Sequence, residues 1–211
     1  HYLAQQPGGL TDYMFEQDPT QSNRTRNWFE VNWNLYALRF NHAFDNQADF
    51  SLQLFGLDAS RSAVGYRSNR VSNPDIDGTV RDLIIGDFVN WGAEARYLKR
   101  YSLNDNNNAY LIGAKYYQAK NSSIQGPGSS GSDADFDLAI DEFPLYANQS
   151  EYSYPNLNFA IFGENIFRFG QNFSVTPGFR IEYIKTQADG YYRKINLDLV
   201  GNPILDETIY E

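Results

Sequence analysis

Apolar and polar residues alternate strictly from Phe173 to Tyr183. Aromatic and aliphatic side chains share one face of this segment, and small, hydroxyl and charged side chains share the other. A run of 11 residues with a period of two is about the length that a tilted strand needs to cross a bilayer. The preceding segment, Asn156–Phe169, alternates in the same way and puts Glu164 on its polar face. We therefore predict an antiparallel hairpin with one face towards lipid and the other towards a wet interior.

Charged residues fix the orientation of this hairpin. Arg180 at the midplane of a membrane would cost roughly 2–4 kcal/mol if it faced lipid, so the face that it shares must be the interior one. Pro177 interrupts the second segment because proline has no N–H to give to a neighbouring strand. A β-bulge at Pro177-Gly178 is the expected way to accommodate it.

The same alternation predicts six spanning strands in all. Their expected ranges are Trp28–Phe44, Phe50–Arg61, Phe88–Tyr101, Ala109–Lys120, Asn156–Phe169 and Phe173–Gln187. In the first of them the apolar phase changes near Leu35, from the side of Trp33 to the side of Tyr36. A bulge near Leu35 or an upper half that stands above the membrane would each produce this change, and both alternatives stay open.

Short and long connections alternate between these segments. The short ones are Asp45–Asp49, Ser102–Asn108 and Gly170–Asn172, and the long ones are Ala4–Asn27, Ser62–Asp87, Asn121–Pro155 and Ala188 onward. Tight periplasmic turns opposite long outer loops are typical of outer-membrane barrels, whereas a β-sandwich mixes its connection lengths. His1-Tyr2-Leu3 is interpreted as the tail of another strand, and Asp189–Glu211 as a polar loop with no strand after it. Six strands do not close a barrel, so the predicted fold is an all-β, antiparallel segment of a larger transmembrane β-barrel.

Composition is compatible with this fold and argues against some classes of function. A mean hydropathy of −0.56 resembles that of a water-soluble domain, but a barrel carries its membrane signal in alternation. Aromatic residues make up 16% of the chain, which suits the aromatic girdles of a barrel. The net charge of −9 argues against a nucleic-acid partner and requires a local basic cluster for any anionic ligand. Two histidines, no cysteine and no nucleophile motif make an enzyme unexpected.

Several motifs resemble those of TonB-dependent receptors of Gram-negative outer membranes. The most specific are Asn158-x-Ala160-x-Phe162-x-Glu164 and Thr176-Pro177-Gly178-x-Arg180-x-Glu182. Gly8-Gly9-Leu10, Phe15-Glu16-Gln17-Asp18-Pro19 and Ala59-Ser60-Arg61-Ser62 are similar to the ferric dicitrate branch. The resemblance implies a barrel of about 22 strands with an N-terminal plug. Residues 1–211 would be the central part of that barrel, without the plug and the remaining strands.

The resemblance also implies a function. The protein would be an outer-membrane transporter that takes up a ferric chelate, ferric citrate or another siderophore, into the periplasm. The TonB–ExbB–ExbD complex would energise it through the N-terminal part, and the chelate would be cargo, with no resident cofactor or metal. A passive outer-membrane barrel or an adhesin without energised transport is the alternative. A secreted carbohydrate-binding sandwich is a third possibility, because aromatic residues also serve as stacking platforms.

Two arginines are candidate ligand contacts. Arg61 matches a ligand-binding position of the family, and alternation from Ser51 and Gln53 independently places it on the interior side. Arg81 is the expected match for a second family arginine. The third would fall within 132–137, which is acidic here, so the chelate itself stays open. For Arg61, an ion pair inside the barrel is as good a role as a ligand contact. For Arg81, the role of an ordinary loop residue is favoured over a ligand contact. Four interior residues are expected to form an ion-pair network, namely Lys115, Glu164, Arg180 and Glu182.

Overall fold

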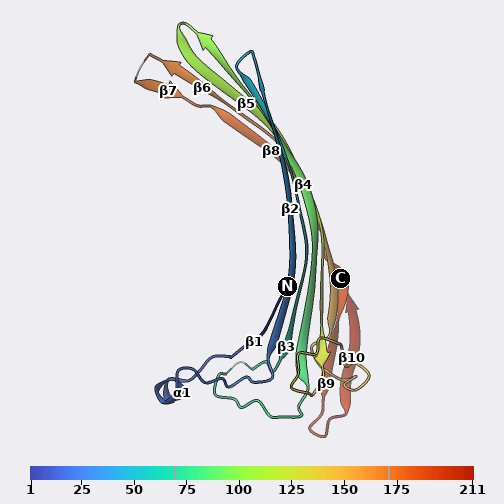
Figure 1. Cartoon of the computed structure of the whole chain (residues 1–211). Coiled ribbons are helices and arrows are strands. Elements are labelled where there is room, and N and C mark those ends of the chain that lie inside the picture. Colours follow the sequence, from blue (N-terminus) through green and yellow to red (C-terminus); the bar gives the residue numbers. More distant parts are fainter. Residues whose placement is uncertain (69, 171) are drawn as a thin grey trace.

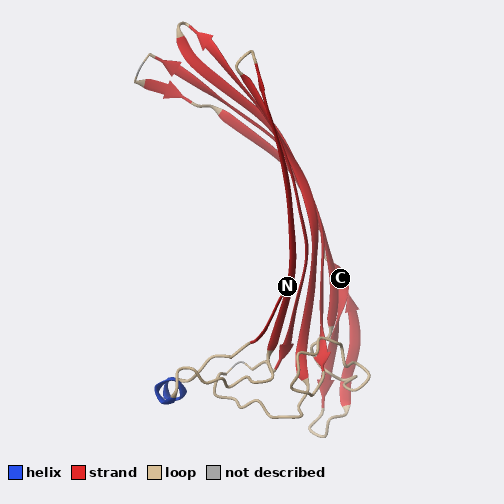
Figure 2. Ribbon diagram, viewed as in Figure 1, coloured by secondary structure: helices blue, strands red, loops and turns tan. Residues whose placement is uncertain are grey.

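The computed structural model describes residues 1–68, 70–170 and 172–211. Ten strands form one antiparallel sheet, and a short helix, α1 (Asp12–Gln17), lies in the first long connection (Figure 2). The strands are β1 (Tyr2–Gln5), β2 (Trp28–Phe44), β3 (Ala48–Gly65), β4 (Arg81–Leu103), β5 (Asn106–Gly128), β6 (Ser150–Phe169), β7 (Phe173–Val175), β8 (Gly178–Thr186), β9 (Asp189–Leu197) and β10 (Pro203–Tyr210).

The sheet is a single curved and twisted layer that does not close on itself (Figure 1). Its strand order is β1-β2-β3-β4-β5-β6-β9-β10, and β7 and β8 also pair with β6. The tight turns gather at one end of the sheet and the long connections at the other (Figure 1). We call these the turn end and the loop end. The turn between β6 and β7 includes Gln171, which lies outside the described residues.

Five of the predicted strands are present as single strands, and the sixth, Phe173–Gln187, is divided into β7 and β8. Four of the five extend further towards the loop end than alternation indicated. β4 and β5 have 23 residues each, about 75 Å of extended chain. The predicted tail of a strand at the N-terminus is β1, which pairs with β2. The prediction of a polar loop over Asp189–Glu211 is wrong, because β9 and β10 form a hairpin there. Polar contacts hold this hairpin, since Arg193 donates to both carboxylate oxygens of Asp206 at 2.8 Å, and alternation does not detect such contacts.

The expected bulge at Pro177 is also wrong. β7, β8 and β9 pair with β6 in one unchanged register, so they form one ladder with two interruptions. At the first, Asn165 donates to the Pro177 carbonyl at 3.0 Å, and proline has no N–H for the return bond. At the second, Gln187 donates to the Pro155 carbonyl at 3.1 Å, and the return bond is again impossible. Each gap in the ladder therefore has a proline as its cause.

Strand register assigns every residue to one of two faces. The outer face carries Phe50, Trp91, Tyr110, Phe159 and Phe179 in the half nearest the turns. No second layer of the described chain covers it, and Phe179 keeps 53% of its surface exposed. This single-layer arrangement is contrary to a sandwich, in which the apolar faces of two sheets would bury each other. Among the described residues, no helix is long and apolar enough to cross a membrane.

Apolar residues change face halfway along the strands. Nearer the loop end, the outer face is polar, with Asn34, Asp58 and Asp87, while the inner face carries Trp33 and Leu35. β2 and β3 pair without a register shift along their whole length, so no bulge causes the change of phase near Leu35. The structure therefore agrees with the other alternative, in which the loop-end half stands beyond the apolar band.

Candidate functional site

Charged side chains cross the inner face as a belt near the turn end. Directly paired residues on successive strands lie side by side. The strand register therefore places the charged side chains in two neighbouring rows. We define the charged belt by Arg39, Glu94, Arg96, Lys115, Arg180 and Glu182. Strict alternation puts all six on the face opposite to the apolar band.

Two arginine–glutamate pairs and one phenylalanine organise this belt. Arg96 binds the Glu94 carboxylate at 2.6 Å, and Arg180 binds Glu182. Phe162 lies between the two arginines, whose guanidinium carbons are 5.8 and 5.3 Å from its ring centre. Such cation–π contacts hold the charged groups in place without a further carboxylate.

The structure assembles the predicted network in part. Arg180 and Glu182 form an ion pair, but among the described residues Lys115 and Glu164 form none. Lys115 is the cross-strand partner of Glu94 and lies 5.8 Å from the Phe55 ring centre. Glu94 and Arg96 were not singled out from the sequence, although Glu94-x-Arg96 has the same spacing as Arg180-x-Glu182. A wider network of these residues stays a prediction.

Arg61 lies on the inner face nearer the loop end, as alternation predicted. Its side chain is exposed, and its guanidinium carbon is 5.9 Å from the Phe88 ring centre. No carboxylate of the described chain is within ion-pair distance of it. The cation is therefore available to a negatively charged group from outside this chain.

Arg81 is in a different position. It belongs to the outer-face series of β4 and is fully buried beneath the loop that follows β5. Its guanidinium donates to the carbonyls of Arg26, Ser129 and Asp133 and to the Ser129 hydroxyl, at 2.7–3.1 Å. The structure does not bring Arg81 together with Arg61, and a ligand contact by Arg81 stays a prediction.

Arg26 joins three loops and was not identified from the sequence. Its guanidinium pairs with Asp75 and donates to the carbonyls of Ile76, Thr79 and Ser130. These contacts link the connections 6–27, 66–80 and 129–149. We call Arg26, Asp75 and Arg81, with the backbone they bind, the loop clasp. An arginine in a polar loop without periodicity gives no sequence signal of such a role.

Asp82 anchors the 129–149 loop from the inner face. Its buried carboxylate accepts hydrogen bonds from Arg67 at 2.8 Å, Gln125 at 3.0 Å and Tyr146 at 2.8 Å. Burial, together with the Asp82 charge, raises the pKa of Tyr146 well above the ordinary value of a phenol. The hydrogen bond to Asp82 raises the pKa of Arg67. Among the described residues, no group of three or more His, Cys, Asp or Glu could hold a metal ion.

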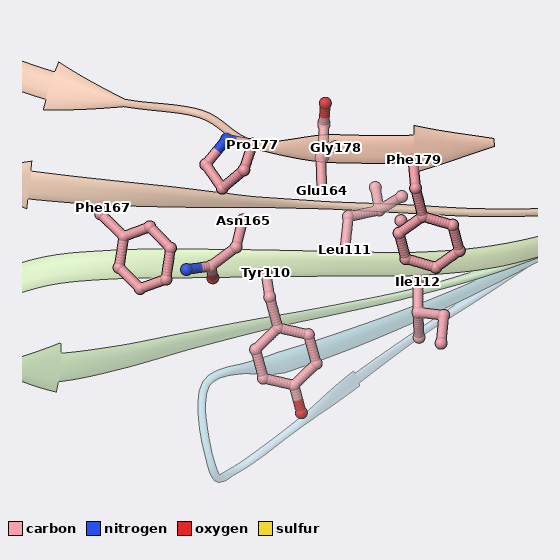
Figure 3. Close-up of a pocket in the computed structure, with 10 residues that line it drawn as sticks. Tyr110, Leu111, Ile112, Glu164, Asn165, Phe167, Pro177, Gly178 and Phe179 are labelled. Carbon is pink, nitrogen blue, oxygen red and sulfur yellow. The ribbon is translucent and has the colours of Figure 1, made fainter.

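An open hollow of about 470 Å³ lies near the turn end, beside the Pro177 gap. Tyr110, Ile112 and Phe179 project into it from the outer side of the strands, while Glu164 points to the opposite side (Figure 3). Asn165, also on the outer side, donates to the Tyr101 hydroxyl at 2.9 Å. Aromatic and aliphatic groups dominate this hollow, so it suits an apolar chain and not an anionic chelate.

Comparison with solved structures gives the fold a precedent. The ferric citrate transporter FecA, in its unliganded form, superposes with a TM-score of 0.64 over 99% of this chain. The chain therefore shares the fold of the part of FecA on which it superposes. Identity is 18%, and this chain covers 27% of the FecA chain, so the likeness concerns the fold alone. No family model matches the sequence, and no curated protein matches it either.

Proposed function

We propose that this chain forms part of the wall of an outer-membrane transporter that takes up a ferric chelate into the periplasm. The uncovered apolar band of the outer face carries the proposal. From Phe173 to Tyr183 every outer residue is apolar, and Lys185 follows. Ten residue steps measure about 33 Å along a strand, or about 25 Å in height at a tilt near 40°. That height is the thickness of the apolar band of an outer-membrane barrel.

The charged belt would then face the barrel interior at membrane height. Its arginine–glutamate pairs are satisfied within the wall. Its remaining charges, Arg39 and Lys115, and the neighbouring Glu164 would face the space that a plug would occupy. The plug and the region that contacts TonB–ExbB–ExbD would belong to parts of the receptor outside these 211 residues. Energised release of the ligand would depend on that contact.

Arg61 would meet the chelate above the belt. The wall excludes part of the solvent there, so pairing between a cation and an anionic ligand is stronger than in bulk water. Arg81 would support the same site indirectly, because the loop clasp holds the loops that border it. The likeness to a ferric citrate transporter supports a chelate as cargo but does not choose one.

Uptake of radioactive iron by cells with and without the gene tests this function. We expect uptake from at least one ferric chelate to require the gene and the proton gradient. In the complete protein, Arg61→Ala should weaken binding of that chelate by about tenfold, the order expected for one charged hydrogen bond. Arg39→Ala removes an exposed charge from the belt on the same face and should leave binding unchanged. Uptake that ignores the gradient would indicate a passive barrel, and loss of cell attachment alone would indicate an adhesin.

A further inference from the structure

A row of aromatic side chains crosses the inner face on the loop-end side of the charged belt. Register places Trp33, Ala59, Phe88, Asn121 and Tyr154 side by side on β2 to β6. Aromatic residues therefore occur on every second strand, about 9–10 Å apart, with smaller residues between them. Arg61 lies two residues from Ala59 on β3, at the loop-side edge of this row. We call these five residues the aromatic row.

The rings of the row are presented to the interior. Trp33 keeps 55% and Tyr154 38% of its surface exposed, while Phe88 is half-buried below Arg61. Tyr152 stacks beside Tyr154, with ring centres 6.0 Å apart and planes within 19°. Large exposed rings gathered on one face indicate a binding surface, because tryptophan and tyrosine offer flat contact area at little cost in conformational entropy.

Asn121 is the polar member of the aromatic row, and its side-chain oxygen lacks a hydrogen-bond donor among the described residues. Its side-chain oxygen is buried and accepts no hydrogen bond. It lies between Phe88 and Tyr154, which are its cross-strand neighbours. Buried acceptors are nearly always satisfied in folded proteins, so a partner with an N–H or O–H group is expected there.

The charged side chains near the row also bear on the kind of ligand. Among the described residues there, Arg61 is a cation without a carboxylate partner, whereas the donors of Arg26 and Arg81 are bound to Asp75 and to backbone carbonyls, and Arg67 is bound to Asp82. Three rings beside one cation match a ligand that presents aromatic rings together with negative charge.

We propose that the aromatic row and Arg61 bind the aryl rings of a chelate whose iron-binding groups are of the catechol or phenol type. Trp33 and Tyr154 stack on the rings, Asn121 accepts from an N–H or O–H of the ligand, and Arg61 meets its negative charge. This inference rests on the proposed function, since it takes the cargo to be a ferric chelate. Under this proposal the chain would bind a different class of chelate from FecA, which is a ferric citrate transporter.

Binding of two ferric probes to the complete, detergent-purified protein tests the inference. The probes are the ferric complexes of 2,3-dihydroxybenzoate and of citrate, followed by isothermal titration calorimetry. We expect the aryl complex to bind at least about tenfold more tightly, because stacking on one ring contributes on the order of 1–3 kcal/mol. Trp33→Ala and Tyr154→Ala should each weaken aryl binding by about tenfold, and Trp33→Phe should restore most of it.

Trp91→Ala is the matched control, because Trp91 is equally exposed but lies on the outer face. It should leave aryl binding unchanged, and unchanged unfolding midpoints for Trp33→Ala and Tyr154→Ala would show that those variants fold. Tighter binding of citrate, or aryl binding indifferent to Trp33→Ala and Tyr154→Ala, would overturn the aryl assignment and leave the transport proposal standing. If neither complex binds and deletion of the gene alters no iron uptake, both proposals fail.

Discussion

Three glycines lie directly opposite phenylalanines on neighbouring strands. Gly92 pairs with Phe55, Gly113 with Phe162 and Gly163 with Phe179. A Cβ atom built on Gly92 would lie 2.4 Å from the Phe55 ring and 2.6 Å from the Tyr116 carbonyl oxygen. Because Gly92 has no side chain, the Phe55 ring can pack flat against the neighbouring strand at that position. At Gly113 the same device brings Phe162 between the two arginines of the belt.

Gly92→Ala should therefore destabilise the wall. The added methyl group meets a backbone oxygen, which cannot rotate away as a ring can, so overpacking should cost about 1–3 kcal/mol. Gly56→Ala is the matched control in the adjacent strand, since its nearest neighbour would be 3.4 Å away. Urea unfolding of the complete protein in detergent measures both, and equal midpoints for the two variants would contradict this account.

Tyr146 gives a residue-scale prediction that depends on pH. Its raised pKa means that the folded chain holds the phenol proton more tightly than the unfolded chain does. The stability that this provides is fully present below about pH 10, the unfolded value, and is lost as the pH rises through the folded value. Subtracting the 295 nm titration of Tyr146→Phe from that of the parent protein should show one group ionising above pH 10. A difference curve centred at or below pH 10 would refute the raised pKa of Tyr146.

At the scale of elements, the loops are fixed by arginine contacts with backbone. A buried arginine bound to several carbonyls is costly to disrupt, because its removal leaves those acceptors without donors. Arg81 holds the acidic stretch 131–137 through the Asp133 carbonyl, and the Trp28 indole N–H donates to the neighbouring Ser132 carbonyl. The loop clasp therefore needs no cation from a ligand to close it.

Arg81→Ala should open the 129–149 loop while the sheet stays intact. Loss of hydrogen bonds worth roughly 1.5–3 kcal/mol to a charged donor should speed amide exchange in that loop by about tenfold or more. Amides in the turn-end halves of β4 and β5 should keep their protection. Arg61→Ala, which removes an arginine without hydrogen bonds to the described chain, is the control, and similar exchange in both variants would rule out the clasp.

Alternation located the six strands but not their outer ends or the last hairpin. The signal depends on one face being apolar and the other polar, and it weakens where the apolar residues change face. β9 and β10 depend on Arg193 and Asp206, a pair separated by 13 residues, and single-sequence periodicity does not reveal such pairs. The same reasoning placed Arg61 correctly because it continues an unbroken strand. It had no means of finding Arg26, or the burial of Arg81, because loop contacts have no period.

At the scale of the whole molecule, the outer face should be covered by lipid in its turn-end half only. These 211 residues contain no cysteine, so a cysteine introduced here adds one new reactive position to this part of the protein. In the complete protein in lipid bilayers, Ile181→Cys should react with a water-soluble maleimide roughly tenfold or more slowly than Asp87→Cys, because a thiol in an apolar environment stays protonated. Both positions are exposed on the outer face, so equal rates would contradict the membrane boundary.

The two proline gaps beside β6 also have a mechanical consequence. β4 and β5 are joined by one unbroken ladder. The ladder of β6 with β7, β8 and β9 is instead interrupted at Pro177 and again at the position that faces Pro155 of β6. A force applied to the C-terminal end of the chain would have to separate three short ladders one after another, whereas the β2–β3 and β4–β5 hairpins each have a single continuous ladder. Extraction of this region by an atomic-force tip would accordingly proceed in smaller steps than extraction of its neighbours.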